Sequence, residues 1–418
     1  KLLKDKFVSR ISFTEITPSA IEEAIKNPRE IDQNLVNAYL ARRILDHLIG
    51  FKVSPFLWRH ISRAKSAGRV QSPSLRIVCE KEDEIDAFTP EEFWPFSGKF
   101  NYKDFQVDAD LTSINGEKTD KKRVSNEIEA KQIENELTSQ SFYLKEIESK
   151  PQSNSSKAPF RTSTLQQAAS SKLSFTADRT MRVAQKLYED GLITYLRTDG
   201  ISISNDILND LRNFIANEYG EKYLSEKPKI YKSKAANSQE AHEPIRPTDF
   251  SVKPSKAKLT GDEMKLYSLI WNRTLASQMS NSKYERKTLV ISSKDEKYIF
   301  RAASRKNLFL GFELLTKEED EDGTDTEFPE NLKEQEELIL KVVNFEQKFT
   351  SPPRRYSEAS LIKKMEEEGI GRPSTYASIL KNLREKKYTY GAKSITPSDL
   401  GRVLSAYLKF IFKDFFIE

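Results

Sequence analysis

Residues 191–200 read GLITYLRTDG, which places Tyr195 two positions before Arg197 in a short β-prone run. The apolar spacing before this run predicts a helix that ends at Gly191. A phenol has a pKa of about 10, so a nucleophilic tyrosine faces a deficit of about 4 kcal/mol at neutral pH and needs cations nearby. Arg197 would supply one such cation. The same residues also fit a buried strand tyrosine beside a surface ion pair between Arg197 and Asp199.

Four further blocks accompany this stretch along the chain. They read SAGRVQS at 66–72, PFRTSTLQQAAS at 159–170, AHEPIRPT at 241–248 and YSEASLIKKMEEEGIGRPSTYASI at 356–379. In this order the five blocks resemble the type IA DNA topoisomerases, specifically the bacterial topoisomerase I branch. Leu196 supports that branch, because topoisomerase III enzymes usually carry a proline after the tyrosine. The resemblance covers nearly the whole chain.

The resemblance implies a mechanism as well as a family. Tyr195 would cleave single-stranded DNA and keep the 5′-phosphate as an ester, so that strand passage relaxes negatively supercoiled DNA without ATP. Arg197 would stabilise the phosphate, and His242 would contact that phosphate or assist proton movement. Taken alone, a histidine is usually structural or merely exposed, and it is the match to the family's block that favours this role.

The family's magnesium-binding Toprim domain is not found in this sequence. Mg²⁺ is therefore expected in the intact enzyme, with no cofactor or metal in this chain. We expect this fragment to bind single-stranded DNA but to relax supercoils poorly or not at all. The alternative is a non-catalytic single-stranded DNA-binding module. Substitution of Tyr195 separates the two, since only an enzyme would lose its activity.

Charge and composition favour a DNA-binding protein. The 418 residues carry a formal charge of +5, yet residues 318–337 hold eleven carboxylates and one lysine, which leaves +15 on the rest. A basic body suits a polyanion. The single cysteine, Cys79, excludes an internal disulfide and a cysteine-cluster zinc site. No apolar run has the length of a signal peptide or membrane span, so we expect a cytoplasmic protein. The resemblance implies a bacterial, nucleoid-associated protein that acts as a monomer.

The helix expected over about residues 33–48 carries Arg42, Arg43 and Asp46, with Phe51 and Trp58 shortly after it. Cations interleaved with aromatic rings suit single-stranded nucleic acid. An amphipathic helix with a solvated basic face is the alternative, and the resemblance favours DNA contact. Two positions depart from the family, since His47 replaces the usual arginine and Phe51 the usual tyrosine.

The block at 66–72 precedes a helix that we expect to begin with Ser72 as its cap and Pro73 at its first position. Small residues there let a backbone approach closely, and free N–H groups at a helix start accept phosphate. The expected DNA contacts are Ser66, Ala67, Gly68, Arg69, Val70 and Gln71. A plain helix cap with a surface arginine is the alternative.

The last block predicts one helix that ends at Gly369 and a second that starts at Pro373. Arg372, Ser374 and Thr375 would then meet phosphate at the second helix start. An αα-hairpin without a ligand fits equally well, and the resemblance favours DNA. In the block at 159–170, Arg161 precedes a helix and is also expected to touch the DNA backbone.

The fold class predicted is α+β multidomain, with helical and winged-helix-like domains and a β-rich arch. Alternating aromatic residues after residue 88 predict antiparallel strands, and ISF at 11–13 predicts a short strand before a helix capped by Thr17. The acidic segment 318–337 is expected to be a solvated loop, since Asp320 and Asp322 lack a third carboxylate for magnesium. The domains expected are the end of the Toprim junction at 1–31, a helical DNA-binding domain at 32–87 and 354–418, the arch at 88–155 and 281–353, and the active-site tyrosine domain at 156–280.

Overall fold

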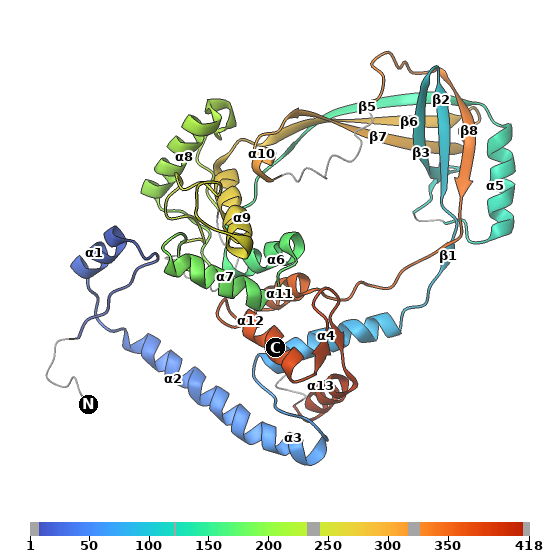
Figure 1. Cartoon of the computed structure of the whole chain (residues 1–418). Coiled ribbons are helices and arrows are strands. Elements are labelled where there is room, and N and C mark those ends of the chain that lie inside the picture. Colours follow the sequence, from blue (N-terminus) through green and yellow to red (C-terminus); the bar gives the residue numbers. More distant parts are fainter. Residues whose placement is uncertain (1–7, 121–122, 232–242, 317–326, 413–418) are drawn as a thin grey trace. The chain divides into compact units, whose positions relative to one another are not determined.

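The computed structural model describes residues 8–120, 123–231, 243–316 and 327–412. It divides into two compact units that interleave along the chain. The first unit comprises Lys1–Ala87, Lys157–Met279 and Pro353–Glu418, and the second comprises Phe88–Ser156 and Ser280–Pro352. The helices lie mainly in the first unit and the long strands in the second (Figure 1). The α+β class predicted from the sequence is therefore confirmed.

The second unit is built on an antiparallel sheet in the order β2-β8-β5-β6-β7-β3-β4, and β2 also pairs with β3. The pairings therefore close into a ring of six strands with β4 at its edge. The strands are β2 (Phe96–Tyr102), β3 (Phe105–Ile114), β4 (Glu117–Lys118), β5 (Phe142–Asn154), β6 (Ser282–Ser293), β7 (Tyr298–Phe309) and β8 (Glu337–Phe345). A separate pair joins β1 (Glu92–Phe93) to β9 (Lys348–Phe349), and α10 (Glu313–Thr316) is a single helical turn.

The interior of this unit is aromatic. Phe100, Phe142 and Phe300 are fully buried and meet edge to face at 5.1–5.7 Å between ring centroids. One helix, α5 (Glu127–Ser139), interrupts the strands expected after residue 88, and it buries Ala130, Ile133 and Leu137 against the same core. The three buried residues recur at the helical period, which the stretch of alternating aromatics before them obscures.

The first unit contains helices from all three of its chain segments. They are α1 (Pro18–Lys26), α2 (Gln33–Leu48), a π-helical turn η1 (Ile49–Val53), α3 (Ser54–His60), α4 (Gln71–Asp86), α6 (Thr162–Leu173), α7 (Ala177–Glu189), α8 (Asn205–Tyr219), a 3₁₀ turn η2 (Glu221–Tyr223), α9 (Gly261–Gln278), α11 (Glu358–Glu367), α12 (Tyr376–Glu385) and α13 (Asp399–Ile411). Two short strands, β10 (Thr389–Tyr390) and β11 (Thr396–Pro397), pair between α12 and α13.

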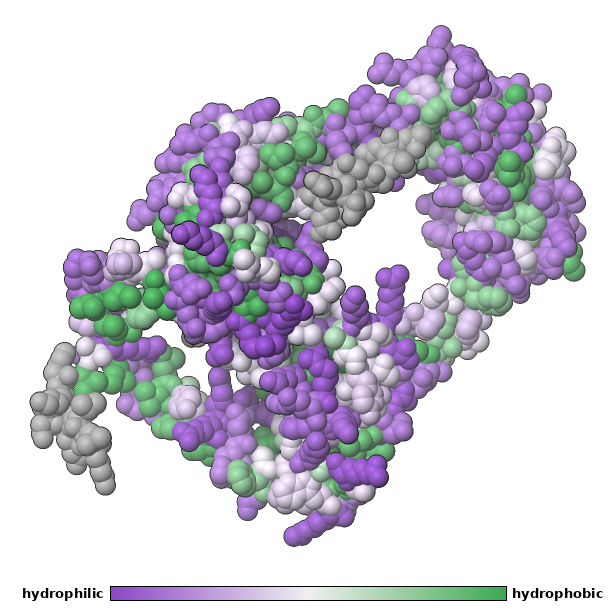
Figure 2. Space-filling model, viewed as in Figure 1, coloured by the Kyte–Doolittle hydropathy of each residue, from purple (hydrophilic) through white to green (hydrophobic). Residues whose placement is uncertain are grey.

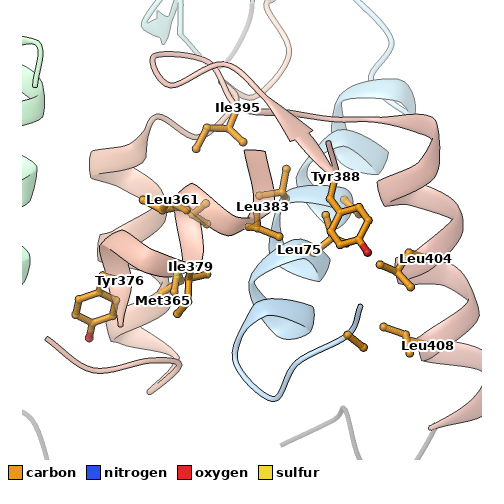
Figure 3. Close-up of a cluster of buried hydrophobic side chains, with 14 of the residues drawn as sticks. Leu75, Leu361, Met365, Tyr376, Ile379, Leu383, Tyr388, Ile395, Leu404 and Leu408 are labelled. Carbon is orange, nitrogen blue, oxygen red and sulfur yellow. The ribbon is translucent and has the colours of Figure 1, made fainter. Parts of the chain in front are cut away.

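A hydrophobic cluster joins α4 to α11, α12 and α13. Leu75 lies among side chains from the three later helices, and its own side chain is fully buried (Figure 3). Tyr388 is also fully buried, but its hydroxyl reaches the block at 66–72, where it donates to the Ser66 carbonyl and accepts from the Lys65 and Ser66 N–H groups. The core therefore fixes the position of a predicted DNA-binding loop.

Several predicted boundaries shift for local reasons. The start of α1 with Thr17 as its cap is confirmed, and so is the helix over residues 33–48. Residues 11–13 form no strand, because only an isolated bridge between Arg10 and Arg29 occurs there. The helix α4 begins at Gln71 rather than after Ser72, since the Ser72 N–H already donates to the Gly68 carbonyl.

Other sequence expectations concern surface segments and reactivity. Asp320 and Asp322 lie outside the described residues, and the described remainder of the acidic segment, up to residue 336, contains no helix or strand. Burial raises the pKa of the Cys79 thiol to about 11, which keeps it protonated and unreactive at neutral pH. Among the described helices, none combines the length and the hydropathy needed to cross a bilayer.

Candidate functional site

Tyr195 lies on an exposed face of an otherwise buried turn. Its side chain is 39% exposed, whereas Thr194, Leu196 and Thr198 are 1–3% exposed. Arg197 is exposed like Tyr195, two positions away, so both side chains leave the turn on its solvent side. The alternative of a buried strand tyrosine is therefore wrong. The turn is extended, with only an isolated bridge between Ile193 and Pro247, and no regular strand forms.

The tyrosine ring has a second tyrosine beside it. The rings of Tyr188 and Tyr195 meet edge to face, with 5.3 Å between centroids. Burial, and then the proximity of Tyr195, raises the pKa of Tyr188. Tyr188 therefore stays a neutral phenol at the end of α7 and supports the Tyr195 ring from its edge.

The block at 159–170 holds the turn from one side. The Thr162 N–H donates to the Thr198 carbonyl at 3.0 Å, and its hydroxyl donates to the Leu196 carbonyl at 2.7 Å. The same hydroxyl accepts from the Thr198 N–H at 2.9 Å. Thr162 is fully buried at the first position of α6, so one threonine orders the backbone on both sides of Arg197.

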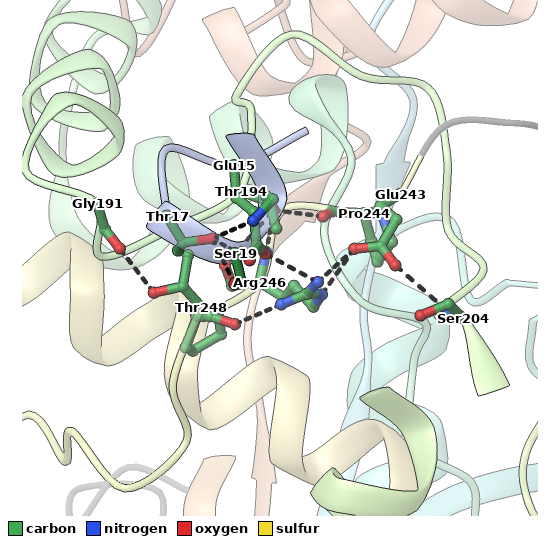
Figure 4. Close-up of polar contacts among 12 residues, drawn as sticks. Glu15, Thr17, Ser19, Gly191, Thr194, Ser204, Glu243, Pro244, Arg246 and Thr248 are labelled. Carbon is green, nitrogen blue, oxygen red and sulfur yellow. Dashed lines mark hydrogen bonds and ion pairs between the residues drawn. The ribbon is translucent and has the colours of Figure 1, made fainter. Parts of the chain in front are cut away.

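The block at 241–248 holds the turn from another side (Figure 4). The Thr194 hydroxyl donates to the Pro244 carbonyl at 2.6 Å, and the Thr248 hydroxyl donates to the Gly191 carbonyl at 2.6 Å. The Thr198 hydroxyl donates to the Glu243 carbonyl at 2.8 Å. His242 itself lies outside the described residues, so its role stays a prediction.

Arg161 connects the tyrosine turn to the last block. Its guanidinium donates to Glu366 on α11 at 2.8 Å, and the Ser163 hydroxyl donates to the other oxygen of the same carboxylate at 2.8 Å. Arg161 is therefore already paired within the fold. Its contact with the DNA backbone stays a prediction.

A groove of about 890 Å³ brings the blocks at 66–72 and 356–379 together within the first unit. Gly68, Arg69 and Val70 line it from one block and Gly369 and Gly371 from the other. Most of the cations that line the groove form ion pairs with carboxylates that also line it. These pairs are Arg76 with Glu80, Lys81 with Glu84 and Lys364 with Glu368. Tyr195 is not part of this lining. The groove and the tyrosine turn are therefore distinct features of the unit.

The end of α2 and the residues that follow it expose aromatic rings. Phe51 is 69% exposed and Trp58 59% exposed. The Phe51 ring stacks on His47 at 4.3 Å, and the Trp58 indole donates to the Lys65 carbonyl at 2.8 Å. The exposed side chains of α2 include many hydrophobic ones, which are visible at the surface in Figure 2. Arg42 and Arg43 are also exposed on this helix.

The Asp46 side chain forms an ion pair within the protein. Its carboxylate accepts from the Arg69 guanidinium at 3.1 Å, which joins α2 to the block at 66–72. Asp46 and Arg69 are both predicted DNA contacts, and in the structure they pair with each other.

Gln71 and Ala67 are buried in the block rather than displayed on it. The Gln71 amide donates to the Ser66 carbonyl at 3.0 Å and accepts from Lys386 at 2.6 Å. Lys386 also donates to the Ser66 hydroxyl at 2.5 Å, and burial lowers its pKa, with the neighbouring Lys65 acting in the same direction. The side chains of Ser66 and Gln71 therefore hold the loop together, and Arg69 is the exposed donor of the block.

The turn before α12 differs from its predicted form. The helix begins at Tyr376 rather than Pro373, because the Thr375 hydroxyl accepts from the Arg372 N–H at 2.8 Å and forms a separate turn. The Arg372 guanidinium donates to the carbonyls of Gly369 and Gly371 at 3.2 and 2.7 Å. Ser374 remains exposed. Contact of these residues with DNA stays a prediction.

Two residues of the site gave no signal in the sequence analysis. The Tyr195 N–H donates to the Thr14 carbonyl at 2.6 Å, and Glu15 pairs with Arg246 at 3.1 Å. Both belong to a segment that the sequence analysis assigned only to a domain junction. Glu15 three positions before a proline-led helix reads as an ordinary acidic residue, so no local pattern distinguishes it.

No cluster of three or more histidine, cysteine, aspartate or glutamate side chains suited to a metal ion occurs in the described ranges. The described part of the site presents the Tyr195 phenol and the Arg197 guanidinium to solvent. Such a set can bind a phosphodiester and present a nucleophile to it.

Comparison with known proteins gives a consistent result. The sequence model of the DNA topoisomerase family matches residues 30–417. DNA topoisomerase 1 of Rickettsia bellii is 48% identical over 99% of this chain and 54% of its own length, and that of Zymomonas mobilis is 43% identical over 99% and 34%. The full-length topoisomerase I structure from Thermotoga maritima matches with a TM-score of 0.83 and 39% identity, over 97% of this chain and 66% of that one. The chain spans about half the length of the Rickettsia relatives.

Proposed function

Because the chain belongs to the bacterial DNA topoisomerase I family of type IA enzymes, we propose that it is the tyrosine-bearing body of an enzyme that relaxes negatively supercoiled DNA without ATP. The observation that carries this proposal is the joint exposure of Tyr195 and Arg197 on a turn whose intervening residues are buried. Substrate and partners of the intact enzyme are part of the proposal. They are single-stranded DNA and negatively supercoiled duplex DNA, bound by a monomer on the bacterial nucleoid.

The chemistry follows from the phenol. The Tyr195 oxygen attacks the phosphorus of a phosphodiester, the bond from phosphorus to the 3′-oxygen breaks, and the 5′-phosphate remains on the tyrosine. The phenol gives up its proton, the departing 3′-oxygen takes one up, and His242 is the candidate for this exchange. The reverse attack by the 3′-hydroxyl reseals the strand. No ATP is needed because the phosphotyrosine ester retains the energy of the broken bond.

Arg197 supplies positive charge where the phosphate gains negative charge during attack. The backbone bonds from Thr162 and Thr198 fix the residues on each side of it, so its exposed side chain starts from a rigid base. By resemblance, Mg²⁺ in the intact enzyme would add charge at the DNA phosphates. The described residues do not fit that ion, and we propose that the Toprim domain of the intact enzyme holds it.

Covalent trapping tests the proposed function. The intact enzyme, in which the N-terminal Toprim part precedes this chain, is incubated with an oligonucleotide labelled on the 3′ side of the cleavage site and then denatured. We expect a labelled protein whose modified peptide covers residues 191–199, with the nucleotide on Tyr195. Attachment to another residue, or no attachment under conditions that support relaxation, would refute the proposal.

Substitution of Arg197 by alanine tests the charge at the phosphate. We expect the rate of single-turnover cleavage to fall by about 10²–10³, because one donor to the developing charge is lost. The affinity for the oligonucleotide should change little. Arg182→Ala is the matched control, since Arg182 is an exposed arginine on α7 that pairs only with Asp178 among the described residues. An equal loss in both variants would point to general electrostatics rather than catalysis.

Single-stranded DNA binding by this chain alone gives a second test. We expect binding that weakens with salt, without relaxation of supercoiled plasmid. Arg42→Ala and Arg43→Ala should each reduce the slope of log K against log salt by about 0.7. Trp58→Ala should cost about 1–3 kcal/mol of binding through lost base stacking.

Tyr390→Ala is the control for stacking, because Tyr390 is 55% exposed in β10 and outside the proposed contact residues. Fluorescence anisotropy with a labelled oligonucleotide measures all four variants. Equal losses for Trp58 and Tyr390, or a salt slope unchanged by both arginine variants, would remove α2 and its flanking aromatics from the DNA-binding surface.

A further inference from the structure

A buried guanidinium lies beside the tyrosine turn. The Arg246 side chain is 3% exposed, and one of its nitrogens lies 2.5 Å from Glu243 and 3.1 Å from Glu15 (Figure 4). The Arg246 Nε donates to Glu243 at 2.8 Å, and the remaining nitrogen donates to the Pro247 carbonyl at 3.0 Å. Both carboxylates are largely buried, with side-chain exposures of 15% for Glu15 and 16% for Glu243.

The cluster lies where three chain segments meet. The Arg246 backbone exchanges two bonds with Thr194, since its carbonyl accepts from the Thr194 N–H and its N–H donates to the Thr194 hydroxyl, each at 2.9 Å. The residue after Thr194 is Tyr195, and its N–H donates to the Thr14 carbonyl at 2.6 Å. The residue after Thr14 is Glu15. The ion pair between Glu15 and Arg246 and the backbone bond between Tyr195 and Thr14 therefore connect the same two segments on each side of the proposed nucleophile.

Glu15 itself is held in place. One of its oxygens accepts from the Thr17 hydroxyl at 3.0 Å, and that hydroxyl also accepts from the Ala20 N–H at the start of α1. The other oxygen faces Arg246. The carboxylate thus connects the start of α1 to the buried guanidinium, which gives it an orienting role rather than a solvent-facing one.

We propose that Glu15 is a positioning residue for Tyr195. Through Arg246 it holds segment 14–17 against the tyrosine turn, so that the Thr14 carbonyl fixes the Tyr195 backbone and the direction in which the phenol leaves it. This inference rests on the proposed function for the meaning of the phenol. The ordering of the tyrosine turn by Glu15 does not depend on the proposed function and is measured separately.

The charges of Glu15, Glu243 and Arg246 predict how the melting temperature changes when one of them is removed. Two carboxylates share one cation, so loss of Glu15 leaves a matched pair of Arg246 and Glu243. Loss of Arg246 instead leaves two largely buried carboxylates for which the described residues offer no other ion-pair partner. In the wild-type background Glu15→Gln removes one ion pair to Arg246 and should lower the melting temperature. In an Arg246→Met background it removes one of two uncompensated carboxylates and should raise the melting temperature.

The first part of the experiment does not depend on DNA cleavage. Amide hydrogen exchange is measured on this chain for the peptides that cover 191–199 and α4. Glu15→Ala should speed exchange at the tyrosine turn and leave α4 unchanged. Glu23→Ala is the matched control, since Glu23 is an exposed carboxylate on α1 bonded to the Asn27 side chain. Unchanged exchange at the turn in Glu15→Ala would overturn the proposal.

The second arm measures cleavage by the intact enzyme. Glu15→Ala should lower kcat about tenfold to a hundredfold through misplacement of the phenol, with KM for the oligonucleotide unchanged. Glu15→Gln, which keeps the length and an acceptor, should recover part of the loss. A raised KM with normal kcat would overturn the positioning role. Faster exchange in Glu15→Ala, together with an enzyme whose covalent bond is not on Tyr195, would support the ordering of the turn by Glu15 and refute the proposed function instead.

Discussion

Replacement of Tyr195 by phenylalanine abolishes the covalent DNA complex and the relaxation of supercoiled plasmid in the intact enzyme. The phenolic oxygen is the only heavy atom removed, and the hydroxyl of the neighbouring Tyr188 is a poor substitute because Tyr188 is largely buried and its pKa is raised. The ring, its contact with Tyr188 and the buried residues on each side remain. We therefore expect the affinity for single-stranded DNA and the melting temperature to stay within error of the wild type.

This variant also separates the enzyme from a non-catalytic DNA-binding module. Gel analysis after denaturation detects the covalent complex, and anisotropy measures binding. Tyr188→Phe serves as the matched control, since it removes the adjacent hydroxyl and should leave activity intact. Residual covalent complex in Tyr195→Phe, or an equal loss in Tyr188→Phe, would assign the chemistry to another group.

Replacement of Glu358 by alanine lowers the free energy of unfolding by about 3–5 kcal/mol, because it removes the buried carboxylate of a partly buried ion pair. Glu358 is 1% exposed, and its carboxylate accepts from Arg384 on α12. The other oxygen accepts from the Ala177 N–H at 2.6 Å, at the first residue of α7. A negative charge there also interacts favourably with the helix dipole.

Chemical denaturation followed by far-ultraviolet circular dichroism measures the change. Glu367→Ala on the same helix is the control, since Glu367 is exposed and lies 3.9 Å from Lys363, and it should cost at most about 0.5 kcal/mol. A loss below about 1 kcal/mol for Glu358→Ala would show that α7 and the last block are not joined through this carboxylate.

Sequence patterns correctly predicted the helices whose starts depend on residues close together in the chain. The cap at Thr17 and the helix over 33–48 follow from a capping hydroxyl, a proline at the first turn and apolar spacing. The starts of α4 and α12 were misplaced because a single bond, from Ser72 to Gly68 or from Arg372 to Thr375, decides where the helix begins. The first bond joins two backbone groups and the second ends on the Thr375 hydroxyl, and neither follows from apolar spacing or from cap preferences.

At the candidate site, too, the sequence indicated some residues, and only the structure revealed the others. The motifs identified Tyr195 and Arg197, and resemblance rather than spacing gave them a role. The contacts that orient Tyr195 come from Thr14 and Thr162, which lie far from it in the chain, and only the tertiary structure brings them together. Arg161, Asp46 and Gln71 have the polarity of DNA ligands, yet each is paired within the fold. Polarity alone does not distinguish the two uses.

The way the chain enters and leaves the second unit has a practical consequence. It departs along β5 and returns along β6, whose ends pair at Asn154 and Ser282, and it first enters and finally departs beside the pair formed by Glu92 and Phe349. Paired residues on antiparallel strands lie only about 5 Å apart. A tight turn from Asn154 to Ser282 would therefore join Phe88–Ser156 and Ser280–Pro352 into one continuous chain, whose two ends lie beside the pair of Glu92 and Phe349. The strand-rich unit can then be expressed as a single short chain and studied apart from the first unit.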